Sequence, residues 1–181
     1  NRLGTPALEA RLERSLRLLR SEQLTLAFVG EFSRGKTELI NALFFAGHGR
    51  RILPSQPGRT TMCPTELFFD AQAKRPYLRL LPIETRLSGA SLTELRQQPS
   101  AWITFNLDPA NPAAMSEVFA EVARVKAVPR EQAVRLGFYP ATLECAEEEG
   151  RVRVPIWRHA LANLDHPLLR KGLRILDTPG L

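Results

Sequence analysis

Gly30-Glu31-Phe32-Ser33-Arg34-Gly35-Lys36-Thr37 is the stretch that decides the fold of this chain. It matches the pattern G-x-x-x-x-G-K-[ST] in full. It follows an apolar run from Leu24 to Val29 and precedes a helix-like stretch from Glu38 to Phe45. In such a loop the backbone N–H groups converge on phosphate, the Lys reaches the β- and γ-phosphates, and the Thr hydroxyl binds Mg²⁺. A strand, this loop and a helix in register predict a site for a nucleoside triphosphate.

A second signal, Asp177-Thr178-Pro179-Gly180, follows the apolar residues Leu173, Ile175 and Leu176. An Asp at the end of a strand parallel to the loop strand is placed to hold Mg²⁺, usually through water. Gly180 would then offer its backbone N–H to the γ-phosphate. On its own the tetrapeptide also fits a surface turn. Its pairing with the phosphate loop favours the metal site.

The third element lies between them, in the Pro- and Gly-rich residues 53–64. A nucleotide-dependent switch needs a threonine on a segment that closes on Mg²⁺ and the γ-phosphate. Thr61, seven residues after Pro54, is our candidate, and Thr60 competes with it. The composition of this segment predicts a loop rather than a helix.

Together these three segments resemble the dynamin-like large GTPases, especially their bacterial members. The resemblance implies GTP as substrate, Mg²⁺ as cofactor, and catalysis supported by Ser33, Lys36 and Thr61. It places Thr37, Thr61 and Asp177 at the metal, and a further charge-compensating cation near Ser33 and Gly58. It also implies a homodimer or oligomer that forms across the nucleotide face, and membrane remodelling. The residues expected to contact nucleotide are Gly30, Glu31, Phe32, Ser33, Arg34, Gly35, Lys36, Thr37, Gly58 and Gly180.

Two loop residues depart from the pattern of this family. Phe32 stands where eukaryotic dynamins carry a glutamine thought to orient water, although bacterial relatives also vary there. Arg34 replaces a small residue and is a candidate for an internal arginine finger. Against this, the side chain at that loop position usually points away from the γ-phosphate.

The base-recognition motif Asn/Thr-Lys-x-Asp does not follow Asp177. The prediction that the base is guanine rather than adenine therefore rests on the resemblance. The chain starts at Asn1 and ends at Leu181, which predicts the N-terminal part of a longer protein whose nucleotide-binding domain continues beyond it. We expect the isolated piece to be inactive. A phosphate-loop ATPase or kinase, and a nucleotide-binding scaffold without turnover, remain as alternatives.

Composition agrees with a globular piece of a cytoplasmic protein. The 181 residues are 44% hydrophobic, enough for one core, with neither an 18-residue apolar run nor a signal peptide. Cys63 and Cys145 lack metal-ligand spacing and are expected to be reduced thiols. We also consider a peripheral position of this cytoplasmic protein at the inner face of the membrane.

The net charge is +6, and residues 1–20 contain five Arg and two Glu. Their leucines recur at helical spacing, which predicts a basic amphipathic helix over residues 1–22. Such a helix can lie on anionic lipid, but more often it packs on protein, as the neck bundle of the resembled family does. The other charges are scattered, so no nucleic-acid partner is expected.

The sequence predicts an α/β phosphate-loop fold with three layers (α/β/α) and a mixed sheet of GTPase type. Residues 23–181 form its N-terminal part, with the phosphate loop at 30–37, the switch at 53–64, an insertion at about 70–165 and the Asp motif at 177–180. Within this part, strands are expected at 24–29, 66–70, 77–81 and 152–156. Helices are expected at 38–45, 91–97, 115–125, 130–136 and 157–164.

Overall fold

A six-stranded mixed sheet forms the centre of the computed structural model, which describes residues 8–9, 12, 23–30, 35–54, 63–138 and 150–179. The strand order is β1-β8-β2-β7-β3-β4. β1 runs parallel to β8, and β2 parallel to β7, while the pairs β2–β8, β3–β7 and β3–β4 are antiparallel. The strands are β1 Leu24–Phe28, β2 Thr65–Phe68, β3 Tyr77–Pro82, β4 Ile103–Asn106, β7 Trp157–Asn163 and β8 Leu173–Asp177.

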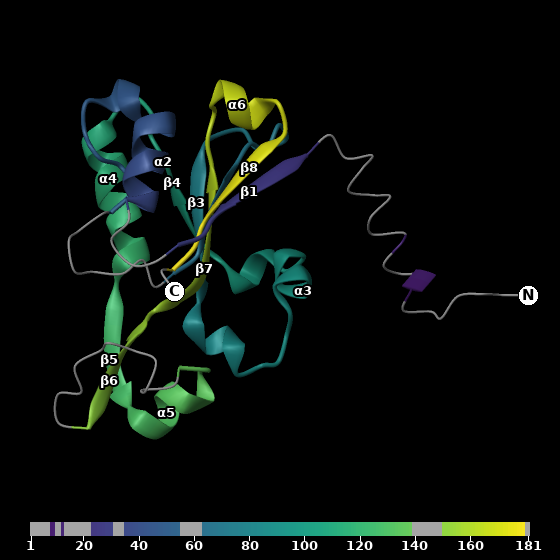
Figure 1. The fold of residues 1–181 in the computed structure, drawn as a ribbon, viewed down its shortest axis with the longest axis vertical. Helices are drawn as coiled ribbons and strands as arrows, with labels where there is room; N and C mark the ends of the chain where they lie inside the picture. The colour runs from purple at the N-terminus through teal and green to yellow at the C-terminus, as the bar shows by residue number, and fades with distance from the viewer. Residues whose placement is uncertain are drawn as a thin grey trace, which may run out of the picture.

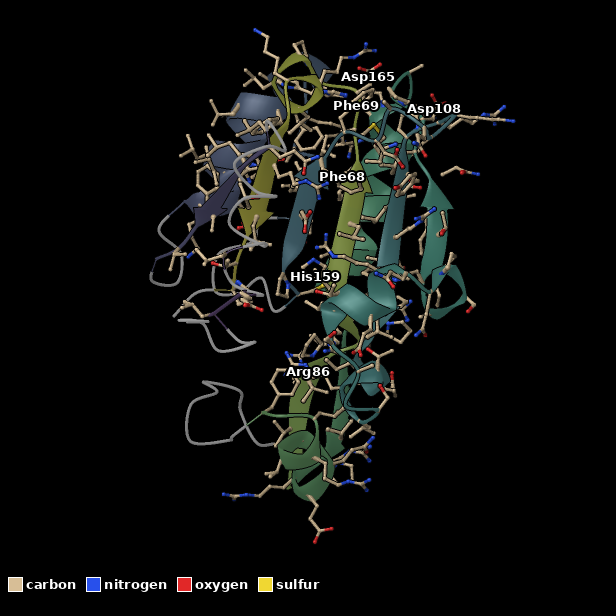
Figure 2. The ribbon with its side chains drawn as sticks, turned by 90° about the vertical axis from the view of Figure 1, so that its right-hand side faces the viewer. Phe68, Phe69, Arg86, Asp108, His159 and Asp165 are labelled. Carbon is tan, nitrogen blue, oxygen red and sulfur yellow. The ribbon has the colours of Figure 1, made fainter. Side chains whose placement is uncertain are left out.

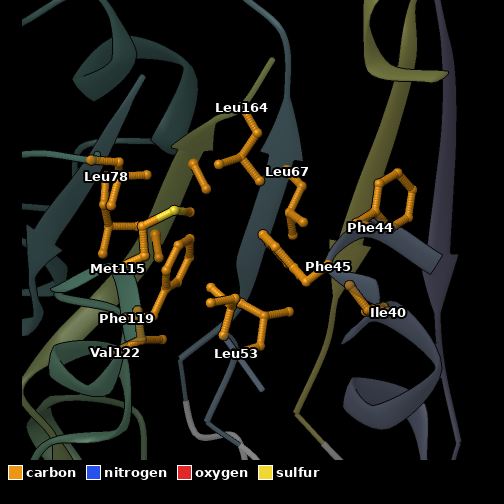
Figure 3. Close-up of a cluster of buried hydrophobic side chains, with 14 of the residues drawn as sticks. Ile40, Phe44, Phe45, Leu53, Leu67, Leu78, Met115, Phe119, Val122 and Leu164 are labelled. Atoms are coloured by element: carbon orange, nitrogen blue, oxygen red, sulfur yellow. The ribbon is translucent and has the colours of Figure 1, made fainter. Parts of the chain in front are cut away.

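Helices cover both faces of this sheet, which confirms the predicted layered α/β architecture (Figure 1). The helices α2 (Lys36–Phe44) and α4 (Pro112–Ala120) lie on one face, and α3 (Leu92–Arg96) lies on the other. The larger core fills the α2–α4 face, where Ile40, Leu67 and Phe119 are buried together (Figure 3). The remaining short helices are η1 Ala46–His48, η2 Ile83–Arg86, η3 Pro99–Ala101, η4 Glu121–Ala123 and α6 Pro167–Arg170.

An arm built on two further strands extends from one end of the sheet (Figure 1). β5 (Val125–Pro129) and β6 (Arg151–Pro155) pair antiparallel, and α5 (Arg130–Arg135) follows β5 directly. Alternate residues of the two strands, Val128, Val152 and Val154, are buried with residues of α5 in a small core of their own. A two-stranded ribbon is marginal in water, so this helix is needed to cover its apolar face.

Most of the predicted elements are present, but residues 157–164 are wrongly predicted as a helix. They form β7, a strand between β2 and β3 in which six of seven residues are buried. A strand covered on both faces lacks the alternation that marks a half-exposed strand, and its Ala and Leu residues favour a helix locally. The helix predicted for 115–125 is also too long, because Val125 already belongs to β5.

The predicted helix at residues 1–22 lies mostly outside the described residues. Of its members, Leu8, Glu9 and Leu12 are described and are helical, and both leucines are exposed. Within the described part of the chain, no helix combines the length and apolar character needed to cross a membrane.

Candidate functional site

The ends of three elements meet where the sequence predicts the phosphate loop (Figure 1). β1 ends at Phe28, which pairs with Asp177 at the end of β8, and α2 begins at Lys36. Gly35 precedes the helix with φ of 78°, a left-handed conformation in which a side chain would be strained. Because Gly35 has no side chain, it gives the helix no side-chain cap.

Lys36 joins the two ends of the loop. Its Nζ donates a hydrogen bond to the carbonyl oxygen of Gly30 over 2.6 Å, across six residues of sequence. A Cβ added to Gly30 would lie 4.0 Å from the Cδ of this lysine, so the side chain crosses close to the loop backbone. The ammonium is thus held at the mouth of the loop, where the sequence places the phosphates.

Thr37 and Asp177 form the centre of the site. The Thr37 Oγ1 donates to the Asp177 Oδ2 over 2.8 Å, although the residues are 140 positions apart in sequence. Asp177 is only 2% exposed, and among the described residues its Oδ1 has no hydrogen-bond partner. Burial raises the pKa of Asp177, while the Thr37 hydroxyl and the charge of Lys36 act in the opposite direction. A buried carboxylate oxygen without a partner is costly unless a cation or a donor completes it.

These groups fit a Mg²⁺ ion. Mg²⁺ prefers oxygen ligands and is commonly held by one or two protein groups together with substrate phosphates and water. The Thr37 hydroxyl and the unpartnered Asp177 oxygen are oxygen ligands of this kind. The described residues contain no group of three or more His, Cys, Asp or Glu side chains placed to hold a metal by themselves.

Backbone pairing fixes Asp177 on both sides. It stands opposite Phe28 of β1 and opposite Thr65, the first residue of β2. Thr178 continues the attachment, because its Oγ1 donates to the carbonyl oxygen of Phe28 over 2.7 Å. The last strand is thereby fastened to the strand that carries the phosphate loop.

The structure brings together Gly30, Gly35, Lys36, Thr37 and Asp177 of the predicted site. The other predicted site residues lie outside the described residues. They are Glu31, Phe32, Ser33, Arg34, Gly58, Thr61 and Gly180, together with the competing Thr60.

Asn41, which the sequence analysis overlooked, joins α2 to the start of the switch. Its Oδ1 accepts hydrogen bonds from the backbone N–H of Ile52 (3.1 Å) and of Leu53 (2.9 Å). Its Nδ2 donates to the carbonyl oxygen of Leu53 over 3.0 Å. Asn is a poor residue for a helix interior. The sequence signal that could have revealed this residue was its position one helical turn after Thr37.

A buried ionic cluster that was also overlooked lies behind the site, on the α3 face. Glu66 of β2 accepts hydrogen bonds from Arg96 of α3 and from Arg174 of β8, the latter over 2.7 Å. His159 of β7 lies next to it, with Nε2 3.7 Å from a Glu66 oxygen (Figure 2). Burial acts to raise the pKa of Glu66, but these neighbours outweigh it and lower the pKa to about 2. The cluster ties β2 to β8 and to α3, which lies within the insertion.

Comparisons with known proteins found similar chains among the solved structures. Two solved structures, both described as an oligomerised bacterial dynamin pair that provides a mechanism for the long-range sensing and tethering of membranes, share 15% and 14% identity with it. Their TM-scores are 0.44 and 0.40, and each match covers 99% of this chain but 26% of the other. The chain thus spans about a quarter of the length of these proteins. A search of curated proteins gave no match.

The sequence model of the Dynamin family matches residues 26–181. This range contains the end of β1, the start of α2 and Asp177, and it confirms both the resemblance and the GTPase-type phosphate-loop fold. Because the match covers most of its residues, the chain belongs to the dynamin family.

Proposed function

We propose that this chain binds GTP with Mg²⁺ and that the full-length protein hydrolyses it as a dynamin-like GTPase. The observation that carries the proposal is the hydrogen bond between Thr37 and Asp177 beside Lys36, at the adjacent ends of β1 and β8. These are the residues that the two sequence motifs assign to metal and phosphate. Membership of the dynamin family supports guanine as the base.

The described residues have separate roles in this proposal. Lys36 and the first amides of α2 bind and orient the phosphates, since a helix N-terminus favours anions. Thr37 and Asp177 hold Mg²⁺, which when bound neutralises charge on the phosphate oxygens. Because phosphoryl transfer needs little covalent help from protein, the rate depends on how accurately these groups are placed.

Residues outside the described part complete the proposed site. We assign Thr61, with Thr60 as its rival, to the metal and the γ-phosphate, and Gly180 to the γ-phosphate through its N–H. Ser33 and Gly58 would support a monovalent cation next to the phosphates. Glu31, Phe32 and Arg34 contribute loop backbone, and the residue that orients the attacking water is left unassigned.

Family membership also supports the wider parts of the proposal. In the full-length protein, residues 23–181 belong to the nucleotide-binding domain, and 70–165 form its insertion. From the sequence pattern alone, we assign residues 1–22 to a basic amphipathic helix. The full-length protein would form a dimer or oligomer across the nucleotide face and act at an anionic membrane surface from the cytoplasm.

The experiment that tests the proposal is Mg²⁺-dependent binding of a fluorescent GTP analogue to the full-length protein. Unlabelled GTP and ATP serve as competitors, and Lys36→Ala is the control. We expect displacement by GTP but not by ATP, loss of binding in the variant, and phosphate release over many turnovers. Displacement by ATP would indicate an ATPase or kinase. Binding without phosphate release would indicate a scaffold.

A further inference from the structure

The Asn41 amide bridges two segments that both lead to the nucleotide site. Thr37 and Asn41 are four residues apart in α2 and therefore lie on the same side of the helix, one turn from each other. The amide contacts Ile52, which comes directly before the switch (residues 53–64), and Leu53, which is the first residue of the switch. One buried side chain thus connects the metal-binding helix to the start of the switch.

The three hydrogen bonds of Asn41 leave little freedom at Leu53. The side chain of Asn41 is 6% exposed, and Ile52 and Leu53 are 1% and 2% exposed. Leu53 belongs to the same buried cluster as Phe45 and Ile40 (Figure 3). Both the N–H and the carbonyl of Leu53 are satisfied by the same amide, so its peptide groups cannot turn without losing a buried hydrogen bond.

Only an amide of this length meets the requirement. The backbone of Leu53 presents a donor and an acceptor, so its partner must both accept and donate. Aspartate would accept from the two N–H groups but would place a second oxygen against the Leu53 carbonyl. Alanine would leave two N–H groups and one carbonyl buried without partners.

The other end of residues 55–62 is also fixed, next to Asp177. Cys63 is fully buried, the Pro64 carbonyl accepts from the N–H of Ala160 over 2.9 Å, and Thr65 stands opposite Asp177. The segment therefore starts from a point tied to the helix of Thr37. It ends at a point tied to the strand of Asp177.

We propose that Asn41 is a positioning residue of the nucleotide site, which fixes Leu53 relative to Thr37 and so sets where the chain carrying Thr60 and Thr61 begins. The inference rests on the proposed GTPase function and deepens it. Asn41 does not touch the nucleotide in this proposal; it acts through the peptide groups of residues 52 and 53.

Asn163 provides a matched control. It is also a buried Asn, 3% exposed, whose Oδ1 accepts from the Asp70 N–H over 2.8 Å and whose Nδ2 donates to the Arg75 carbonyl over 3.4 Å. It pairs with Phe68, the last residue of β2, whereas Asp177 pairs with the first residue of that strand. Asn163→Ala therefore removes comparable hydrogen bonds at the end of β2 that lies away from the site.

The test compares Asn41→Ala and Asn163→Ala in the full-length protein by GDP affinity and by kcat for GTP. We expect both variants to bind GDP as wild type does, because the phosphate loop is intact. We expect kcat of Asn41→Ala to fall about tenfold to a hundredfold, as misplaced catalytic groups do, while Asn163→Ala keeps its rate. Amide exchange at residues 52 and 53 should quicken only in the Asn41 variant.

Equal kcat values for the two variants would overturn the inference. If Asn41→Ala fails to bind GDP, Asn41→Asp takes its place, because it retains both acceptor contacts and the side-chain volume; a wild-type kcat in that variant would equally overturn it. If the wild-type protein does not turn over GTP, both the proposed function and this inference are overturned. Turnover that depends on Lys36 but not on Asn41 would remove only the inference.

Discussion

Replacing Glu66 with Gln should loosen the pairing of β2 with β8, the strand that carries Asp177. The pKa of Glu66 is lowered from 4.5 to about 2, which corresponds to about 3 kcal/mol of stabilisation at neutral pH. Arg96 and Arg174 are 36% and 27% exposed, and contact with water reduces the expected loss to about 2 kcal/mol. A free-energy change of 1.36 kcal/mol corresponds to a tenfold change in an equilibrium constant, so amide exchange in β2 and β8 should quicken roughly 30-fold.

The pH dependence of this effect has a definite sign. A carboxyl whose pKa is lower in the folded state stabilises the protein above its unfolded pKa, and loses that contribution as the pH falls to the folded pKa. The difference between wild type and Glu66→Gln should therefore be full at neutral pH and shrink between pH 4.5 and about 2. Comparing the two proteins at each pH cancels the intrinsic pH dependence of exchange.

Hydrogen exchange measured by mass spectrometry on the full-length protein checks this prediction peptide by peptide. Asp165→Asn is the control, because it removes a carboxylate paired with Arg170 where both side chains are at least half exposed. Such exposed pairs contribute little, so exchange in β2 and β8 should not change. If Glu66→Gln exchanges no faster than this control at neutral pH, the reasoning from the buried cluster is refuted.

Three further predictions concern single residues. Asp177→Asn removes a buried charge, so calorimetry should show that the variant unfolds no more readily than wild type. Its Mg²⁺-dependent affinity for GTP, measured by binding titration, should fall about 10- to 100-fold. Ser91→Ala removes the capping box of α3 and should cost that helix about 1 kcal/mol, seen as faster local exchange. Burial raises the pKa of the Cys63 thiol to about 12, so alkylation at pH 8, followed on the peptide that contains it, should require unfolding; rapid labelling of the native protein would contradict this.

Local patterns predicted the strand, the loop and the helix of the candidate site. The glycines, Lys36 and Thr37 lie within eight residues, so their strand, loop and helix could be read directly. Asp177 was found because it ends a short apolar run. The hydrogen bond between Thr37 and Asp177 confirms that the two motifs meet in space, whereas the roles of these residues stay predictions.

The features that were missed depend on contacts between distant segments. β7 is a strand because it lies between β2 and β3, and its own residues do not indicate this. Glu66 resembles any charged residue until Arg174, 108 positions later, is placed beside it. Asn41 gains its meaning only when Ile52 and Leu53 fold back onto α2.

The strand order has a consequence for how the protein is made. β8 lies between β1 and β2, yet it begins at Leu173, long after β1 ends at Phe28. At typical ribosomal speeds the nascent chain needs roughly 7 to 30 seconds to cover this interval. Throughout that time, the strand that leads to the phosphate loop lacks its partner in the sheet. The unpaired edge of β1 is then accessible to chaperones and to other nascent chains, so the rate of translation becomes a factor in the yield of nucleotide-competent protein.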